Sequence, residues 1–209
     1  MSKGVDGDLP TQVEPPLGDQ ANVAETVEEG QRRDDAGAAG EHAVGAFRIP
    51  DDYIVLEGAA RGNRRGVGVV VSRFNSEITS AMLQRALEAL DDAGVARESV
   101  TVMPVPGAFE LPLAAMALAK TRRFACVVAL GCVIRGETAH FDYVAGEAAS
   151  GLQLAAIETG IPVSFGVLTC ETREQAQARI PRAADAVTSA LEMADLFTRI
   201  RAHASPAGS

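Results

Sequence analysis

The strongest constraint on the fold of this chain is a short apolar run that leads through a loop into a helical pattern, at residues 127–159. The run from Val127 to Leu130 is rich in β-branched side chains, which is typical of a strand buried on both faces. After the loop at residues 135–138, the apolar period becomes that of a helix that begins near Ala139 and extends to about Thr159. The apolar positions that indicate this helix are Phe141, Val144, Ala148, Leu152 and Ala155.

Three further units of the same kind complete the pattern. Their apolar runs lie at residues 67–71, 100–103 and 162–168, and the helical patterns that follow begin near residues 76, 110 and 173. Parallel strands that alternate with helices are joined by right-handed crossovers, so both faces of the sheet are covered. The predicted fold class is therefore α/β: a three-layer α/β/α arrangement of flavodoxin-like type, with a four-stranded parallel sheet and helices on both faces.

Individual residues set the expected boundaries of these elements. We expect Ser76 to cap the first helix, Pro112 to lie in the first turn of the second, and Pro181 to break the helix that begins near Arg173. Residues 53–56 are apolar enough for a short strand at the edge of the sheet. The last helix is expected to have an apolar face formed by Ala186, Ala190, Met193 and Phe197.

Charge and composition divide the chain into three segments. Residues 1–47 hold ten acidic and three basic side chains, a net charge of −7, and few large apolar residues, so this segment is expected to be a disordered acidic tail. Residues 48–201 form the expected folded domain, and residues 202–209 an expected flexible C-terminus. The whole chain has a net charge of −9, which disfavours nucleic acid as a partner.

Composition also excludes several other classes of protein. No apolar run reaches the roughly 18–20 residues that cross a bilayer, and the N-terminus lacks the basic and apolar regions of a secretory signal. We therefore expect a cytoplasmic protein without membrane contact. Cys126, Cys132 and Cys170 lie in or beside apolar runs, which indicates buried free thiols in a reducing compartment. The three histidines are scattered along the sequence, so no metal site is expected.

The loop at residues 135–138 lies between the carboxyl end of a predicted strand and the amino end of a predicted helix. At such a junction, free backbone N–H groups and the helix dipole favour an anion, and open α/β sheets bind ligands there. The hydroxyl of Thr138 and the imidazole of His140 suit phosphate binding beside proton transfer. These residues also fit an interpretation without function, in which Thr138 caps the helix and His140 is incidental.

Other side chains follow the predicted strands at the same edge of the sheet. Phe74 can stack on a flat heterocycle, and Glu110 can accept hydrogen bonds from ligand hydroxyl groups. Both also have structural interpretations, as a packed aromatic residue and as a carboxylate at a helix amino end. Phe165 is most simply a core residue of a strand, and Arg179 a surface charge. The sequence contains neither an evident nucleophile–base pair nor a glycine-rich dinucleotide or P-loop motif.

Taken together, several sequence blocks in a fixed order resemble the lumazine synthases, which catalyse the penultimate step of riboflavin biosynthesis. The resemblance covers about residues 66–197. Its blocks are SRFN at 72–75, VPGAFELP at 105–112, GCVIRGETAHFDYV at 131–144, PVSFGVLT at 162–169, EQAQAR at 174–179 and ALEMA at 190–194. The resemblance implies a transferase that condenses 5-amino-6-ribitylaminouracil with 3,4-dihydroxy-2-butanone 4-phosphate to 6,7-dimethyl-8-ribityllumazine, without an organic cofactor or a metal.

The resemblance also implies a role for each candidate residue. His140 would transfer protons, and Phe74 would stack on the pyrimidine ring. The residues that would line the rest of the ring and ribityl site are Ala108, Glu110, Val133 and Ile134. The residues that would bind the phosphate are Gly136, Glu137 and Thr138, the first two through backbone amides. Phe165 and Arg179 would come from the neighbouring subunit, where they would cover the ring and neutralise the phosphate.

Assembly is a further implication of the resemblance. Lumazine synthases place their sites at the interfaces of a homopentamer, which in some members closes into a sixty-subunit icosahedral capsid, and riboflavin synthase is a candidate partner. In place of the glycine- and lysine-rich stretch that the family commonly carries after the position of Arg179, residues 180–187 of this chain form a shorter segment. A second basic ligand of the phosphate is therefore missing unless Arg182 replaces it.

Three alternatives are weighed against a lumazine synthase. An archaeal-type riboflavin synthase would use lumazine as its substrate, but the intact GETAHFDY block at 136–143 favours the lumazine synthase. A catalytically impaired paralogue that binds lumazine or forms a shell would be consistent with the shortened segment after Arg179. A flavodoxin-like electron carrier is disfavoured, because residues 73–75 are not a hydroxyl- and glycine-rich phosphate loop.

Overall fold

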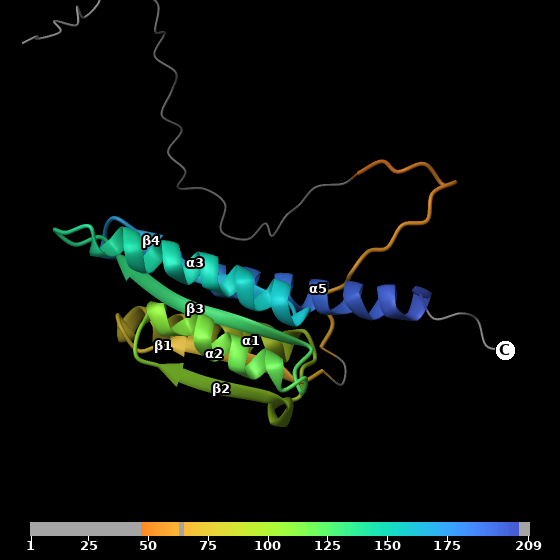
Figure 1. Cartoon of the computed structure of the whole chain (residues 1–209), viewed down its shortest axis with the longest axis horizontal. Coiled ribbons are helices and arrows are strands. Elements are labelled where there is room, and N and C mark those ends of the chain that lie inside the picture. Colours follow the sequence, from red (N-terminus) through yellow and green to blue (C-terminus); the bar gives the residue numbers. More distant parts are fainter. Residues whose placement is uncertain (1–46, 63–64, 205–209) are drawn as a thin grey trace, which may run out of the picture. The chain divides into compact units, whose positions relative to one another are not determined.

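The computed structural model describes residues 47–62 and 65–204, and the statements that follow concern these residues. Within them, four parallel strands form one sheet in the order β2-β1-β3-β4 (Figure 1). The strands are β1 (Val67–Ser72), β2 (Val100–Val105), β3 (Cys126–Ile134) and β4 (Val163–Cys170). The predicted parallel sheet is confirmed. Of the predicted acidic tail, residues 1–46 lie outside the described residues.

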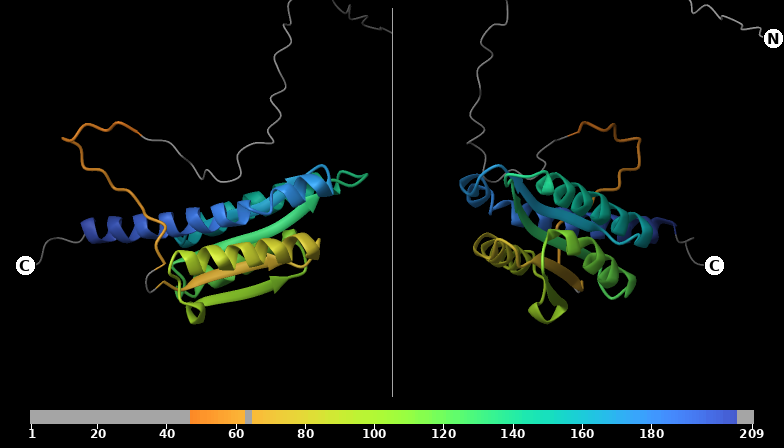
Figure 2. Two further views of the ribbon diagram at one scale, coloured as in Figure 1. Left: turned by 180° about the vertical axis from the view of Figure 1, so that it is seen from behind. Right: turned by 60° about the vertical axis from the view of Figure 1, so that its left-hand side comes forward.

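In this described part of the chain, five α-helices cover both faces of the sheet (Figure 2). One face packs against α1 (Ser76–Asp92), α4 (Arg173–Ala178) and α5 (Arg182–Ala204). The other face packs against α2 (Leu111–Lys120) and α3 (His140–Thr159). This arrangement is the three-layer α/β/α fold that the alternation of apolar runs and helical patterns predicts.

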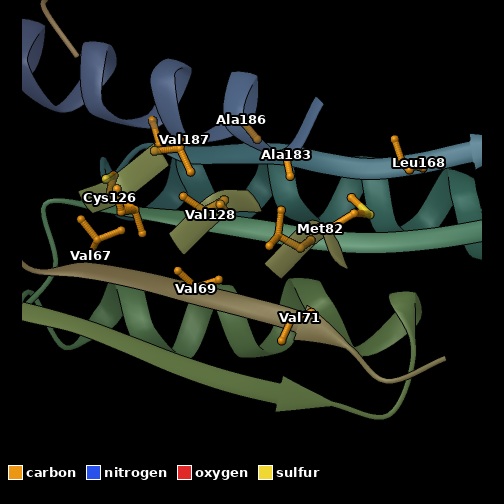
Figure 3. Packing of buried hydrophobic residues seen from close by; sticks show 14 of the residues in the cluster. Val67, Val69, Val71, Met82, Cys126, Val128, Leu168, Ala183, Ala186 and Val187 are labelled. Carbon is orange, nitrogen blue, oxygen red and sulfur yellow. The ribbon is translucent and has the colours of Figure 1, made fainter. Parts of the chain in front are cut away.

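The two cores on either side of the sheet explain the apolar runs in the sequence. Val67, Val69 and Val71 of β1 belong to the core beneath α1 and α5 (Figure 3), whereas Val70 belongs to the core beneath α2 and α3. Successive side chains of a strand point to opposite faces, and both faces are covered here, so consecutive residues are apolar. Each fully buried side chain of this size contributes about 1.5–3 kcal/mol to folding.

A glycine brings α3 close to α2. A Cβ atom at Gly151 would lie 2.7 Å from the Cβ atom of Pro112, which is too close for any side chain. The two helices therefore pack at a distance that only glycine permits at this position. Pro112 lies in the first turn of α2, as predicted, where its missing N–H is not needed. This contact fixes the helix whose first residue is His140.

Prolines also mark two boundaries. β2 continues through Pro104 to Val105, two residues beyond the predicted run, and it is an edge strand, where a missing N–H is tolerated. Pro181 separates α4, which ends at Ala178, from α5, which begins at Arg182. The predicted break at this proline is confirmed.

Several detailed expectations were wrong. Residues 53–56 form no strand in the described structure, and their side chains are exposed. Ser76 does not cap α1: the N-cap is Asn75, in a left-handed conformation with φ of 57°. Of the expected apolar face of α5, Ala186 and Ala190 are buried, but Met193 is 41% exposed, and Leu191, which was not assigned to that face, is buried. Residues 202–204, which we assigned to a flexible C-terminus, are helical.

Candidate active site

A cavity of about 710 Å³ lies at the carboxyl ends of β1, β2 and β3. Eight of the predicted site residues line it: Phe74, Ala108, Glu110, Val133, Ile134, Gly136, Thr138 and His140. They come from the three βα loops that meet at this edge of the sheet, and from the strand and helix ends beside them. The cavity therefore brings together these eight residues, which are expected to bind the pyrimidine, to bind the phosphate and, in the case of His140, to transfer protons.

The loop between β1 and α1 is tied to both neighbouring loops. The backbone N–H of Arg73 donates to the carbonyl of Val105 at 2.8 Å, and that of Phe74 donates to the carbonyl of Pro106 at 3.1 Å. The Nδ2 atom of Asn75 donates to the carbonyl of Cys132 at 2.9 Å. These bonds leave the ring of Phe74 70% exposed at the mouth of the cavity. An aromatic ring held in this way can stack on a planar ligand.

The loop between β2 and α2 places Glu110 in the cavity. Ala108 is buried, and the short 3₁₀ turn Ala108–Glu110 joins β2 to α2. A Cβ atom at Gly107 would lie 3.1 Å from Oε2 of Glu110, so a larger residue there would displace this carboxylate. The glycine keeps the carboxylate close to the backbone of the loop. Its oxygens can then accept hydrogen bonds from hydroxyl groups of a ligand.

The loop between β3 and α3 brings a helix amino end to the cavity. His140 is the first residue of α3, and its backbone N–H donates to Oγ1 of Thr138 at 3.4 Å. Thr138 thus makes the local contact expected of a capping residue, although the N-cap position itself is Ala139. Residues 135–140 are exposed, which leaves the loop accessible to a ligand. Because a helix amino end carries partial positive charge, the loop is suited to an anion such as phosphate.

A cluster around Arg135, which was not among the predicted site residues, fixes this loop from outside the cavity. The guanidinium forms ion pairs with Asp142 in α3 at 3.0 Å and with Glu171, after β4, at 2.9 Å. It also lies over the ring of Phe141, with its central carbon 4.1 Å from the ring centroid. The hydrogen bond from Arg135 holds the pKa of Asp142 below its ordinary value, and the two carboxylates raise the pKa of Arg135.

Three aromatic side chains of the cavity were not among the predicted site residues. Phe109, Phe141 and Tyr143 line it together with the predicted set. Phe109 is 56% exposed and Tyr143 is 71% exposed, which is unusual for large side chains with an apolar ring. All three lie inside sequence blocks that carried the resemblance, so their position beside Glu110 and His140 was the available signal.

The three remaining predicted residues do not line this cavity. Glu137 belongs to the loop, but its neighbours Gly136 and Thr138 form the wall. Phe165 lies on the edge strand β4 and is 48% exposed, contrary to its interpretation as a core residue. Arg179 is an exposed residue at the C-cap of α4, and its Nη1 atom donates to the carbonyl of Gln175 at 3.0 Å.

The cysteines and charged clusters offer little other chemistry. All three cysteines of the sequence lie in the described part and are buried and free, as predicted. Burial raises the pKa of Cys126 to about 12 and that of Cys132 to about 11, so neither thiol is a nucleophile near neutral pH. Among the residues that the structure describes, no three His, Cys, Asp or Glu side chains are grouped as metal ligands. The helices in the same residues are too short or too polar to cross a membrane.

Comparison with known proteins adds the family to this geometry. The family model for 6,7-dimethyl-8-ribityllumazine synthase matches residues 65–198, well over half of the chain. The match spans every strand, all three loops of the cavity and most of α5. It confirms the resemblance of the sequence blocks, and with it the transferase reaction that forms 6,7-dimethyl-8-ribityllumazine from two small molecules in riboflavin biosynthesis. On this match and this fold, the chain belongs to the 6,7-dimethyl-8-ribityllumazine synthase family.

Proposed function

We propose that this chain carries out the condensation at sites shared between neighbouring subunits of a homo-oligomer. In each site, the cavity of one subunit is completed by Phe165 and Arg179 of the next. The observation that carries the proposal is the division of the predicted residues. Eight of them line one cavity, whereas Phe165 and Arg179 are exposed side chains outside it. The subunit therefore presents a site that its own chain does not complete.

Inside the cavity, the proposed chemistry is mainly alignment. Phe74 stacks on the pyrimidine ring, Glu110 and the backbone of Ala108 hold the ribityl chain, and Val133 and Ile134 line the ring pocket. The amine of the pyrimidine is already a nucleophile, so holding it against the carbonyl of the second substrate supplies much of the acceleration. Alignment of two bound reactants can lower a barrier by several kcal/mol, in favourable cases by about 7–11 kcal/mol.

The loop 136–138 is the proposed phosphate site. Backbone amides of Gly136 and Glu137, the hydroxyl of Thr138 and the dipole of α3 bind the phosphate of the second substrate. Arg179 of the neighbouring subunit neutralises charge on the departing phosphate. His140, one residue from the loop, transfers the protons that Schiff-base formation, phosphate elimination and ring closure release and consume.

Exposed apolar side chains support assembly. On α2 and α3, Leu113 is 75% exposed, Leu154 51% and Ile157 69%. Exposed apolar patches on a soluble subunit commonly mark interfaces. We propose a homopentamer as the functional unit. Closure into an icosahedral capsid and association with riboflavin synthase rest on the family alone, and analytical ultracentrifugation of the purified protein distinguishes a pentamer from a capsid.

A subunit-mixing experiment tests the shared site. Product formation is followed by lumazine absorbance and fluorescence, against an enzyme-free control because the uncatalysed condensation also proceeds. His140→Ala and Arg179→Ala are each expected to lower the rate strongly. Random co-assembly of the two variants restores an intact site wherever an unmutated cavity meets an unmutated arginine, at about one quarter of all interfaces.

The matched control pairs His140→Ala with Phe74→Ala. Both residues belong to the same cavity, so no arrangement of these two subunits creates an intact site, and activity is expected to stay low. Equal recovery in both mixtures, or recovery in neither, would contradict the shared site. A parent protein that forms an intact oligomer but does not exceed the enzyme-free rate would refute the catalytic proposal itself.

A further inference from the structure

Arg135 lies outside the ring of residues that line the cavity, yet it connects three segments around the proposed phosphate loop. It follows the last residue of β3, and its backbone N–H donates to the carbonyl of Cys170 at the end of β4, at 2.9 Å. Its Nη1 and Nη2 atoms donate to the carboxylate of Asp142 at 3.2 and 3.0 Å. Its Nε atom donates to Glu171 at 3.0 Å. The guanidinium thus links β3, the first turn of α3 and the segment after β4.

The net charge of the cluster of Arg135, Asp142 and Glu171 determines whether it can attract a phosphate. Each of the three guanidinium nitrogens donates to a carboxylate, which engages three of the five N–H groups of Arg135. One positive and two negative side chains leave the cluster with a formal charge of −1. A cluster of this sign does not attract a phosphate. The contribution of Arg135 to phosphate binding must therefore come from the geometry it imposes.

The strength of the cluster follows from its form. Isolated surface ion pairs contribute little, but a bidentate arginine–carboxylate pair within a network of several charges is an exception. The side chain of Arg135 is 37% exposed, and its flat guanidinium rests on the ring of Phe141. A lysine has neither the planar fork nor the stacking surface and could not replace these contacts.

We propose that Arg135 is a positioning residue for the phosphate substrate. Through Asp142 and Glu171, it holds residues 136–138 and the amino end of α3 in the arrangement that binds the phosphate, without touching the phosphate itself. This inference rests on the proposed function, because it takes the 136–138 loop as the phosphate site. Without the cluster, the backbone amides and the amino end of α3 would no longer be held in one arrangement. Small displacements of the binding groups in such a site lower the reaction rate strongly.

The experiment measures the binding of inorganic phosphate to the intact oligomer by calorimetry, together with KM for each substrate and kcat. Arg135→Gln is expected to weaken phosphate binding and to raise KM for the butanone phosphate, each about tenfold, which corresponds to about 1.4 kcal/mol. KM for the pyrimidine is expected to change less than about twofold, because Phe74 and Glu110 lie on other loops. Arg135→Lys is expected to recover only part of the loss.

Asp142→Asn separates positioning from direct contact with phosphate. If Arg135 bound phosphate directly, removing the carboxylate would free its guanidinium, and phosphate affinity would be unchanged or higher. Positioning predicts the opposite result, a loss in the same direction as Arg135→Gln. The double variant Arg135→Gln/Asp142→Asn is then expected to lose little more than either single variant, because both act through one contact.

Arg97→Gln is the matched control. Arg97 also binds an aspartate in bidentate fashion, with Nη2 donating to Asp91 at 2.6 Å, but on the surface near the end of α1 and away from the cavity. The Arg97→Gln variant should leave phosphate binding and both KM values unchanged. Unchanged phosphate affinity in both Arg135→Gln and Asp142→Asn would overturn the inference, even if the parent enzyme is fully active. Calorimetry needs no turnover. An inactive parent would therefore refute the proposed function, while the phosphate affinities of the variants would still show whether Arg135 is a positioning residue.

Discussion

The residues predicted for one active site lie in two regions of the subunit that differ in how they are held. Those at the ends of β1, β2 and β3, apart from Glu137, line one cavity, and hydrogen bonds join the loop after β1 to the ends of β2 and β3. Phe165 on β4 and Arg179 after α4 lie outside that cavity with exposed side chains. The first region is arranged by the sheet within one chain. The second presents groups outward, which is how a subunit supplies residues to another copy.

The two regions are nevertheless in contact through a short series of polar groups. Arg135 binds Glu171, the backbone N–H of Glu171 donates to Oε1 of Gln175 at 3.0 Å, and the carbonyl of Gln175 accepts a hydrogen bond from Arg179 at 3.0 Å. The proposed phosphate loop of one site and the arginine proposed for the next are thus in contact with the same segment after β4. The difference between the regions is that the residues of the first line the cavity, whereas Phe165 and Arg179 lie outside it.

Asn75 gives the largest expected effect, because it ties the cavity region together. Asn75→Ala loses the hydrogen bond to the carbonyl of Cys132 and places alanine at φ of 57°, a left-handed conformation that asparagine tolerates better than alanine. The free energy of unfolding should fall by about 2 kcal/mol from the two effects combined. Asn75→Gly keeps the backbone unstrained and should lose only about 1 kcal/mol.

Urea denaturation at one fixed protomer concentration measures both variants, since assembly shifts apparent stability. The difference between alanine and glycine isolates the backbone strain. If both variants were as stable as the parent, this bond would not hold the loop after β1. The two regions would then not differ in how firmly hydrogen bonds hold them.

Sequence patterns predicted the framework of the cavity region well. The strands, the helix that begins at His140 and the break at Pro181 follow from apolar periodicity and proline chemistry, which are local properties. The cap of α1 was missed because local rules rank asparagine and serine equally as N-caps, and the bond from Asn75 to Cys132 is long-range. The face of α5 was only partly predicted: Ala186 and Ala190 are buried as expected, but Val187 and Leu191 are buried beside them while Met193 is exposed.

The second region shows where such reasoning ends. The sequence blocks imply that Phe165 and Arg179 belong to a site but do not place them relative to a cavity. In the proposed assembly, that placement depends on a second chain. The cluster around Arg135 was missed for a related reason. Its partners Asp142 and Glu171 are 7 and 36 residues away in the sequence, and only the packing of β4 beside β3 brings them together.

Phe165 provides a test of intermediate size. Phe165→Ala is expected to raise KM for the pyrimidine about tenfold through lost contact with the ring, an effect within the range of about 1–3 kcal/mol known for aromatic stacking on bases. Because the side chain is 48% exposed, the stability of the chain should change by no more than about 0.5 kcal/mol. Steady-state kinetics and urea denaturation measure the two quantities.

Co-assembly with His140→Ala shows which region Phe165 serves. Rate recovery in the mixture of Phe165→Ala and His140→Ala subunits is expected, as for Arg179, since the two residues act in different copies. A mixture that recovers no more activity than the pairing of Phe74→Ala with His140→Ala would place Phe165 in its own subunit's site and remove the distinction between the regions.

Arg182 is expected to give the smallest effect. It is the first residue of α5, where a positive charge is unfavourable beside the helix dipole, and its Nη1 atom pairs with Asp185 at 3.1 Å. The pair leaves little net charge for a phosphate, whereas Arg179 donates to a neutral carbonyl and keeps its full charge. Arg182→Gln should therefore change KM for the butanone phosphate by less than about twofold, compared with about tenfold for Arg179→Gln. Steady-state kinetics on both variants decides the matter. Equal losses would mean that Arg182 leaves Asp185 when substrate binds and replaces the basic residue that the shortened segment lacks.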